Sequence, residues 1–280
     1  MCAHQLYISF KPLDSNSLPL NIEQIQACYS EIKHWMTVNL LKLNGDKTEL
    51  LIATNKHLKN VSTIDSIDID SVQINPSESI RNLGAHFNIF MDFVTKKCQS
   101  ARYALRNISR VRSSLTRTAC EMLVQAHVTS RLDYCNALLY GLPKYLIEKL
   151  QKVQNYAARV ITMTPKRDDI TPVLASLHWL PIEQRIEFKT LLYTFKALND
   201  QAPPYLCELV KRRHHTRTLR PADRLELPVI KYSAYGGRTF ERAASELWNS
   251  IEDKLNIKNA PSVDVFKKRL KTYLFRKAYF

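Results

Sequence analysis

The chain has 280 residues, which is enough for one large or two modest domains, and its 45% hydrophobic and 24% charged content is typical of a globular protein. No apolar run reaches the roughly 20 residues that a membrane helix needs, and no signal peptide is expected at the N-terminus. The six cysteines form no Cys-x-x-Cys pair, which favours reduced thiols over disulfides or zinc. We therefore expect an intracellular protein, cytoplasmic or nuclear, without a membrane partner.

The net charge of +15 is distributed unevenly along the chain. Residues 1–94 hold 7 Lys and Arg against 10 Asp and Glu, a net of −3, whereas residues 95–280 hold 34 against 16, a net of +18. A basic excess in one part of a chain predicts a polyanionic partner, most simply nucleic acid. The alternative is a basic surface that only keeps the protein solvated.

The first ninety residues predict one helix among several strands. Residues 5–10 suit a strand, and residues 13–20 suit a loop. A helix should follow, with Asn21 and Gln24 as its capping box. Its apolar face is expected to consist of residues spaced three and four apart, namely Ile22, Ile25, Tyr29, Ile32 and Met36. After a turn at Gly45 and Asp46, a buried strand should begin at Lys47 and include the leucines at 50 and 51.

Two further strand regions precede the basic part. Ile64, Ile67 and Ile69 alternate with acidic residues and lead to Val72 and Ile74, so a hairpin that ends before Pro76 is expected. Residues 79–87 predict a single strand with Leu83 and Gly84 in its middle. A glycine inside a strand usually marks a bulge or a close backbone approach.

From Asp92 onward the pattern becomes helical and basic. Its apolar stripe is expected at Ala101, Leu105, Ile108 and then Val111 or Arg112. Beside the stripe, three arginines recur every four residues and should form one exposed ridge: Arg102, Arg106 and Arg110. Like charges at this spacing repel by a few tenths of a kcal/mol, and a bound anion would relieve that repulsion. The alternative is a merely solvated face.

Residues 114–163 predict two long helices, joined by a segment in which Gly141 and Pro143 stop one helix and restart the next. The first apolar stripe is expected at Leu115, Ala119, Met122, Leu123, Ala126 and Val128. The second is expected at Leu146, Leu150, Val153, Ala157, Val160 and Ile161. Cys135 has no sensibly paired histidine, so we expect a buried small residue and not a nucleophile.

The remainder predicts helices around one basic segment. Thr171 and Pro172 should start a helix, and a turn at residues 177–181 should lead into a helix over 182–199. Residues 211–231 are basic, interrupted by proline and without periodicity, as in a linker or an exposed loop, which makes Lys211, Arg212 and Arg213 candidate phosphate contacts. Two final helices should follow, one ending near Ile251 and one starting near Ser262.

Several of these segments, in this order, resemble the reverse transcriptases of LINE-type non-LTR retrotransposons. Trp35, Asn39, Leu41, Leu43, Asn44, Lys47, Thr48 and Glu49 resemble motif D of the palm. SIRNLGAHF resembles motif E, the primer grip, and SRLDYCNALLYGLP with LQKVQNYAARVI resembles the region past the thumb. LHWLPIEQRIEFK is also typical of the family.

The resemblance implies an α+β fold: a partial palm sheet with a helix at the N-terminus, followed by a mostly α-helical thumb and C-terminal region. The expected division is a partial palm over 1–92, a helical thumb-like domain over 93–165, a helical extension over 166–210, a basic linker over 211–234 and C-terminal helices over 235–280.

The family consists of RNA-directed DNA polymerases that hold two Mg²⁺ ions on palm aspartates. A Tyr-Ala-Asp-Asp hairpin would come just before the strand over residues 5–10, where Met1, Cys2, Ala3 and His4 stand. We therefore expect a truncated, non-catalytic fragment, not an enzyme as it stands, with neither a metal site nor another cofactor. The lysine that matches Lys47 is thought to protonate the leaving pyrophosphate in the family, and here it is expected to be idle.

The expected partner is RNA or an RNA–DNA hybrid, bound along its backbone with low sequence specificity. The candidate binding residues are Leu83, Gly84, Arg102, Arg106, Arg110, Lys211, Arg212 and Arg213. One alternative is a helical scaffold or protein-interaction module without a nucleic-acid role. Another is an active polymerase that receives its palm aspartates from a second chain.

Overall fold

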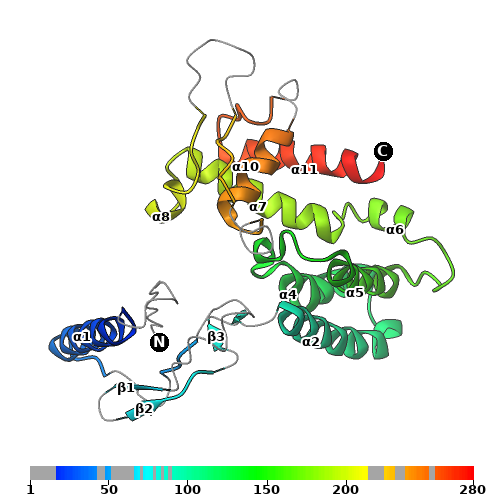
Figure 1. Ribbon diagram of the computed structural model, residues 1–280. Helices are drawn as coiled ribbons and strands as arrows, with labels where there is room; N and C mark the ends of the chain where they lie inside the picture. Colours follow the sequence, from blue (N-terminus) through cyan, green and yellow to red (C-terminus); the bar gives the residue numbers. More distant parts are fainter. Residues whose placement is uncertain are drawn as a thin grey trace. The chain divides into compact units, whose positions relative to one another are not determined.

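The computed structural model describes most of the chain, and the described elements are mainly α-helices with two small antiparallel sheets (Figure 1). The described residues are 17–42, 48–51, 66–69, 72–77, 80–82, 85–87, 90–213, 224–230, 237–251 and 256–280. The chain divides into two compact units, Met1–Phe93 and Val94–Phe280. The coarse expectation of an α+β, largely helical fold is thus confirmed. In the described part of the chain, no helix combines the length and apolar character that crossing a membrane requires.

In the first unit, helix α1 (Ser17–Val38) lies against the hairpin of β1 (Ile67–Ile69) and β2 (Val72–Ile74). The predicted hairpin is confirmed, with Ile67 opposite Ile74. The Nε2 atom of Gln26 donates a 2.7 Å hydrogen bond to the carbonyl of Asp68, which ties the helix to the hairpin. The predicted capping box is wrong, because α1 begins at Ser17, a full turn before Asn21. A proline at position 19 fits the first turn, where helix N–H groups have no intrahelical acceptor.

The second sheet also lies in the first unit and corrects one prediction. Residues 79–87 contain two short strands, β3 (Ile80–Asn82) and β4 (Ala85–Phe87), paired antiparallel. The expected single strand is wrong because Asn82 pairs directly with Ala85, so that only Leu83 and Gly84 separate the strands. A two-residue connection that contains glycine is typical of a tight hairpin.

The structure also lacks, in the described residues 48–51, the buried strand that was expected to begin at Lys47. Lys47 lies outside the described residues. Within residues 48–51 the pairing is one isolated parallel bridge between Leu50 and Pro76, supported by a 2.8 Å hydrogen bond from the Ser77 amide to the Leu50 carbonyl. Leu50 and Leu51 are half-buried. Leu50 therefore bridges to Pro76, just past β2, without joining the β1–β2 ladder.

The second unit begins with three helical segments. These are α2 (Phe90–Arg110), then α3 (Arg117–Val124) continued through a π-helical turn (Gln125–Thr129) into α4 (Ser130–Asp133), and α5 (Lys144–Thr162). Both the predicted stripe of α2 up to Ile108 and the predicted stripe of α5 are buried. Val111 is exposed, because the helix ends one residue before it.

The predicted stripe of the middle segment is wrong except at Val128. Its buried residues are Cys120, Val124, Val128 and Leu132, whereas Met122 is 68% exposed. These four residues recur every four positions, from α3 through the π-helical turn into α4.

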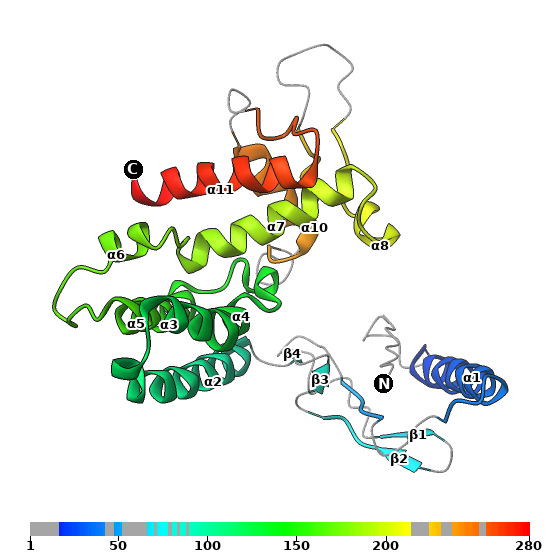
Figure 2. The same ribbon diagram turned by 180° about the vertical axis from the view of Figure 1, so that it is seen from behind.

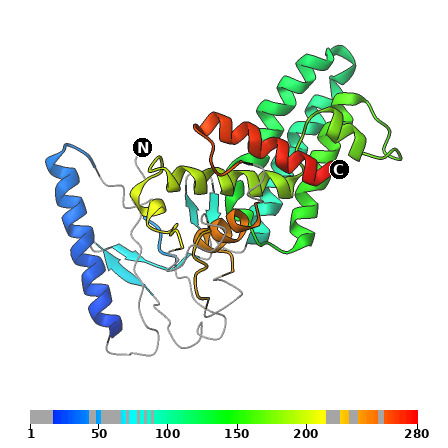
Figure 3. The same ribbon diagram turned by 90° about the horizontal axis from the view of Figure 1, so that it is seen from above.

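The rest of the second unit is built around α7 (Ile182–Leu198), which packs against α5, α8 (Pro204–Cys207), α10 (Phe240–Ser250) and α11 (Val263–Tyr279). Figures 2 and 3 show α11 running beside α7. α6 (Thr171–Ser176) begins where predicted. The core between these helices centres on Phe195 and Phe266, whose rings stack with centroids 4.1 Å apart, and on the buried Trp248.

The described ends of the segment expected to be a linker are anchored to this core. The Arg213 amide donates to the Arg224 carbonyl, and the Glu226 amide donates to the Lys211 carbonyl, both at 2.9 Å. Leu225 between them is buried, and its amide and carbonyl bind the side chain of Asn249 on α10.

Candidate nucleic-acid interface

One face of α2 carries a row of three arginines. The helix buries Val94, Cys98 and its other apolar residues on one side, and Arg102, Arg106 and Arg110 are exposed. Four residues of α-helix rise by roughly 6 Å. The three guanidinium groups therefore follow one another along the helix at nearly regular intervals.

Helix α5 runs parallel to α2, and two contacts fix this arrangement. Beyond the end of α2, the Arg112 guanidinium donates 2.8 Å hydrogen bonds to the carbonyls of Val160 and Ile161 at the end of α5. In the first half of both helices, the buried Cys98 thiol lies close enough to Arg102 and Lys149 to feel both charges. Burial raises the pKa of Cys98, and these cations partly counteract that rise. Arg102 of α2 and Lys149 of α5 thus both lie near the Cys98 thiol, and α2 and α5 run in the same direction (Figure 1).

The outer side of α5 has a stripe in which aromatic and basic residues alternate. Tyr145, Lys149, Lys152 and Tyr156 are spaced four, three and four apart, which places them on one face of the helix. Tyr145 is 49% exposed and Tyr156 is 38% exposed. The Nζ atom of Lys149 lies 5.8 Å from the centroid of the Tyr145 ring, within the range of a cation–π contact.

Residue spacing relates the cationic face of α2 to the stripe of α5. Cys98 lies near both Arg102 and Lys149, and the two helices run in the same direction. Arg106 follows Arg102 by about one turn on α2, and Tyr145 and Tyr156 lie within two turns of Lys149 on α5. We therefore expect the two sets of side chains on the same side of the second unit. We refer to these residues together as the α2–α5 surface: Arg102, Arg106, Arg110, Tyr145, Lys149, Lys152 and Tyr156.

The charge of this region is strongly unbalanced. Residues 94–165 contain 12 Lys and Arg but only three acidic residues. Glu121 pairs with Arg117 at 2.9 Å, and Asp133 pairs with Arg185 at 2.6 Å. The third acidic residue, Glu148, is exposed on α5 beside Lys149 and four residues before Lys152, so it offsets part of the positive charge there. Cations still outnumber carboxylates on the α2–α5 surface.

Lys97 has a different role from the exposed cations of α2. It is buried, and its Nζ atom donates to the carbonyls of Tyr134 at 2.5 Å and Leu132 at 3.4 Å. Burial lowers its pKa to about 8, although the charges of Cys135 and Asp133 oppose that shift. Lys97 therefore fastens α2 to the segment after α4. Cys135, expected to be buried, is only half-buried and has a left-handed backbone.

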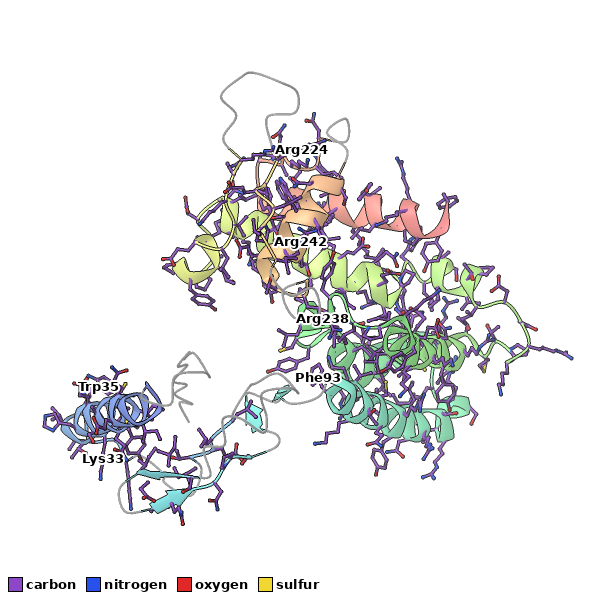
Figure 4. All side chains as sticks on the ribbon, in the orientation of Figure 1. Lys33, Trp35, Phe93, Arg224, Arg238 and Arg242 are labelled. Atoms are coloured by element: carbon purple, nitrogen blue, oxygen red, sulfur yellow. The ribbon has the colours of Figure 1, made fainter. Side chains whose placement is uncertain are left out.

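The structure does not bring the second predicted basic group to this surface. Lys211, Arg212 and Arg213 are exposed, but Arg224, which pairs with Arg213, lies at the opposite end of the second unit from α2 (Figure 4). Arg212 lines a separate hollow of about 450 Å³, whose walls also include Trp248 and Lys258.

The residues that resemble motif D lie in the first unit. Lys47 is outside the described residues, as are Leu83 and Gly84 of the motif E segment. Lys42 and Thr48, on either side of the undescribed residues 43–47, line a hollow of about 510 Å³ between α1 and the β1–β2 hairpin. Trp35 on α1 is 57% exposed (Figure 4). Within the described ranges, no three His, Cys, Asp or Glu side chains gather where they could hold a metal ion.

Sequence reasoning missed the contribution of α5. The spacing of Tyr145, Lys149, Lys152 and Tyr156 was visible as a second stripe beside the apolar one, but nothing local indicated that α2 would lie next to it. Arg112 was assigned to an apolar stripe, whereas its guanidinium binds three backbone carbonyls, including that of Leu115. Comparisons of the chain with protein-family models, curated proteins and solved structures gave no match.

Proposed function

We propose that the unit Val94–Phe280 binds RNA or an RNA–DNA hybrid by its phosphate backbone through the α2–α5 surface. In this proposal it is the thumb-like part of a non-catalytic relative of LINE-type reverse transcriptases. The observation that carries the proposal is the exposed row of Arg102, Arg106 and Arg110 on α2, beside Lys149 and Lys152 on α5.

The row suits a chain of phosphates in spacing and in chemistry. Its interval of roughly 6 Å is comparable to the distance between successive phosphates of one strand. A guanidinium group can bind a phosphate through two parallel hydrogen bonds. Bound phosphates would also relieve the mutual repulsion of the three arginines. Because such contacts position the nucleic acid without contacting base edges, the expected sequence specificity is low.

The family assignment and the lack of activity are supported by the sequence. Several motifs occur in the family's order, and Met1, Cys2, Ala3 and His4 hold no carboxylate where the metal-binding aspartates would stand. Lys47 is then without a reaction to assist. We expect no nucleotide incorporation on a primed RNA template with Mg²⁺ or Mn²⁺. Nucleotide incorporation that co-purifies with the chain, and that is lost when the chain is left out of the reaction, would contradict this part of the proposal.

A second candidate is a protein-interaction module, and the first unit gives it some support. Leu40 is 95% exposed at the end of α1, and Trp35 on the same helix is 57% exposed. Exposed apolar side chains are common at protein interfaces when they form one patch.

Binding of a fluorescently labelled 20-nucleotide RNA and of the matching RNA–DNA hybrid tests the proposal. Replacing Arg102, Arg106 and Arg110 by alanine should weaken binding on the order of 100-fold at 0.1 M salt, if each arginine neutralises one phosphate. The matched control replaces three exposed cations of α11, Lys268, Lys271 and Arg276, and should change affinity less than twofold.

Equal losses in the two triple variants would mean that the attraction is diffuse and that no specific surface exists. Undetectable binding of the wild-type chain at low salt would favour the protein-interaction module.

A further inference from the structure

We infer that the ligand of the α2–α5 surface is single-stranded, with its phosphates along the arginines of α2 and unpaired bases stacked on Tyr145 and Tyr156. The inference rests on the proposed function and narrows it, because a backbone-binding surface alone would accept a duplex equally well.

Tyr145 and Tyr156 are exposed, as are Tyr103, Tyr134 and Tyr205, whereas two other tyrosines of the same unit are engaged by the fold. The hydroxyl of Tyr140 lies 3.2 Å from Oε2 of Glu246, and the hydroxyl of Tyr279 donates to the Trp179 carbonyl at 2.5 Å. Both of those rings are largely covered by the fold. Tyr145 and Tyr156 instead present their rings to solvent on the stripe that borders the arginine row. Eleven residues of helix separate them, which is roughly 16 Å and the span of a few nucleotides.

The lysines on this stripe are placed for a strand that stacks. The Lys149 amine lies over the Tyr145 ring at 5.8 Å, so one side of that ring is next to a cation. A base that stacks on the exposed side would bring its own phosphate close to that charge. Lys152, exposed between the two rings along the helix, would meet the following phosphate. Aromatic rings that alternate with cations are the usual means of binding single strands without sequence preference.

A duplex would use this surface poorly. Its bases are already stacked and paired, so the tyrosine rings could contact only sugars and phosphates. A single row of arginines also follows one strand, whereas a duplex presents two backbones. The preference for single strands over duplexes should therefore depend on the tyrosine rings and not on the arginines.

The test compares four labelled probes at 0.1 M salt by fluorescence anisotropy: 12-nucleotide oligo-U, 12-nucleotide oligo-dT, a 12-base-pair RNA duplex and the matching RNA–DNA hybrid. The single strands should bind at least tenfold more tightly than the duplexes, and the tighter of the two identifies the natural strand. Each of Tyr145→Ala and Tyr156→Ala should weaken single-strand binding on the order of tenfold. Duplex binding should change less than twofold.

Three controls make the result specific. Tyr145→Phe and Tyr156→Phe keep the rings and should retain binding. Tyr205→Ala removes an exposed tyrosine of α8 and should have no effect. Urea denaturation verifies that each variant is folded. Duplex binding as tight as single-strand binding, or alanine variants that bind single strands normally, would overturn the inference while leaving the proposed function intact. Failure of every probe to bind would instead overturn the proposed function.

Discussion

The Nε atom of Arg112 donates a 2.8 Å hydrogen bond to the carbonyl oxygen of Val160, joining the segment two residues past the end of α2 to the end of α5. The last carbonyls of a helix lack intrahelical partners and carry partial negative charge, so a guanidinium is a suitable cap. The same group binds the carbonyls of Ile161 and Leu115. This single side chain thereby holds the two helices of the proposed interface side by side.

Removal of that cap should destabilise the second unit. We expect Arg112→Ala to lower the free energy of unfolding by about 3 kcal/mol, because charge-assisted hydrogen bonds to three carbonyls are lost and water replaces them only in part. Urea denaturation measures the change. The control is Arg110→Ala, an exposed arginine two residues earlier, which should stay within about 0.5 kcal/mol of the wild type. Equal stabilities of the two variants would show that the cap contributes nothing.

Lys97 should make stability depend on pH in the alkaline range. Its pKa is lowered from 10.5 to about 8 in the folded chain, so between these values the unfolded state binds more protons and stability rises with pH. The full gain is about 3 kcal/mol. Tyr140 and Tyr279, whose pKa values burial raises to about 12, oppose this rise above pH 10.

The comparison that isolates Lys97 is therefore the difference in unfolding free energy between the wild type and Lys97→Met. We expect that difference to shift in favour of the wild type between pH 8 and 10.5. A difference that stays constant over this range would mean that Lys97 titrates normally in the folded chain.

Asn249 should be essential for holding residues 224–230 on α10. Its side chain accepts from the Leu225 amide at 2.8 Å and donates to the Leu225 carbonyl at 3.0 Å. Because Leu225 is buried, Asn249→Ala leaves two backbone groups without partners and should cost about 3 kcal/mol. Asn249→Asp keeps the acceptor and should lose less. The exposed Asn259 provides the control, and amide hydrogen exchange at Leu225 reports whether the loss is local.

Helices with a regular apolar stripe could be predicted from the sequence. In α5, the residues from Leu146 to Ile161 repeat with the α-helical period and all lie in the core. The α3 stripe failed because the buried residues of that helix are Cys120 and Val124, whereas the neighbouring apolar Met122, which suits the same period, is exposed. The strand over residues 79–87 failed because a glycine suits either a bulge or a tight turn, and only the pairing of Asn82 with Ala85 distinguishes them.

The candidate site was predictable only in part, because local spacing does not indicate which helices pack together. The spacing of Arg102, Arg106 and Arg110 is a local property of one helix, and it indicated a cationic face. Tyr145 and Lys149 lie more than thirty residues further along the chain, and they reach this face through the parallel packing of α5. That packing depends on tertiary contacts such as the one between Arg112 and Val160, which no local pattern encodes.

The salt dependence of binding tests the central claim most directly. The α2–α5 surface offers five cations, Arg102, Arg106, Arg110, Lys149 and Lys152. If each releases one counterion from a single strand, the slope of log affinity against log salt concentration should be about −3.5 for the wild type and about −1.4 after the three arginines are replaced by alanine. The α11 control, in which Lys268, Lys271 and Arg276 are replaced, should keep the wild-type slope. A wild-type slope near zero, or equal flattening in both triple variants, would contradict the account.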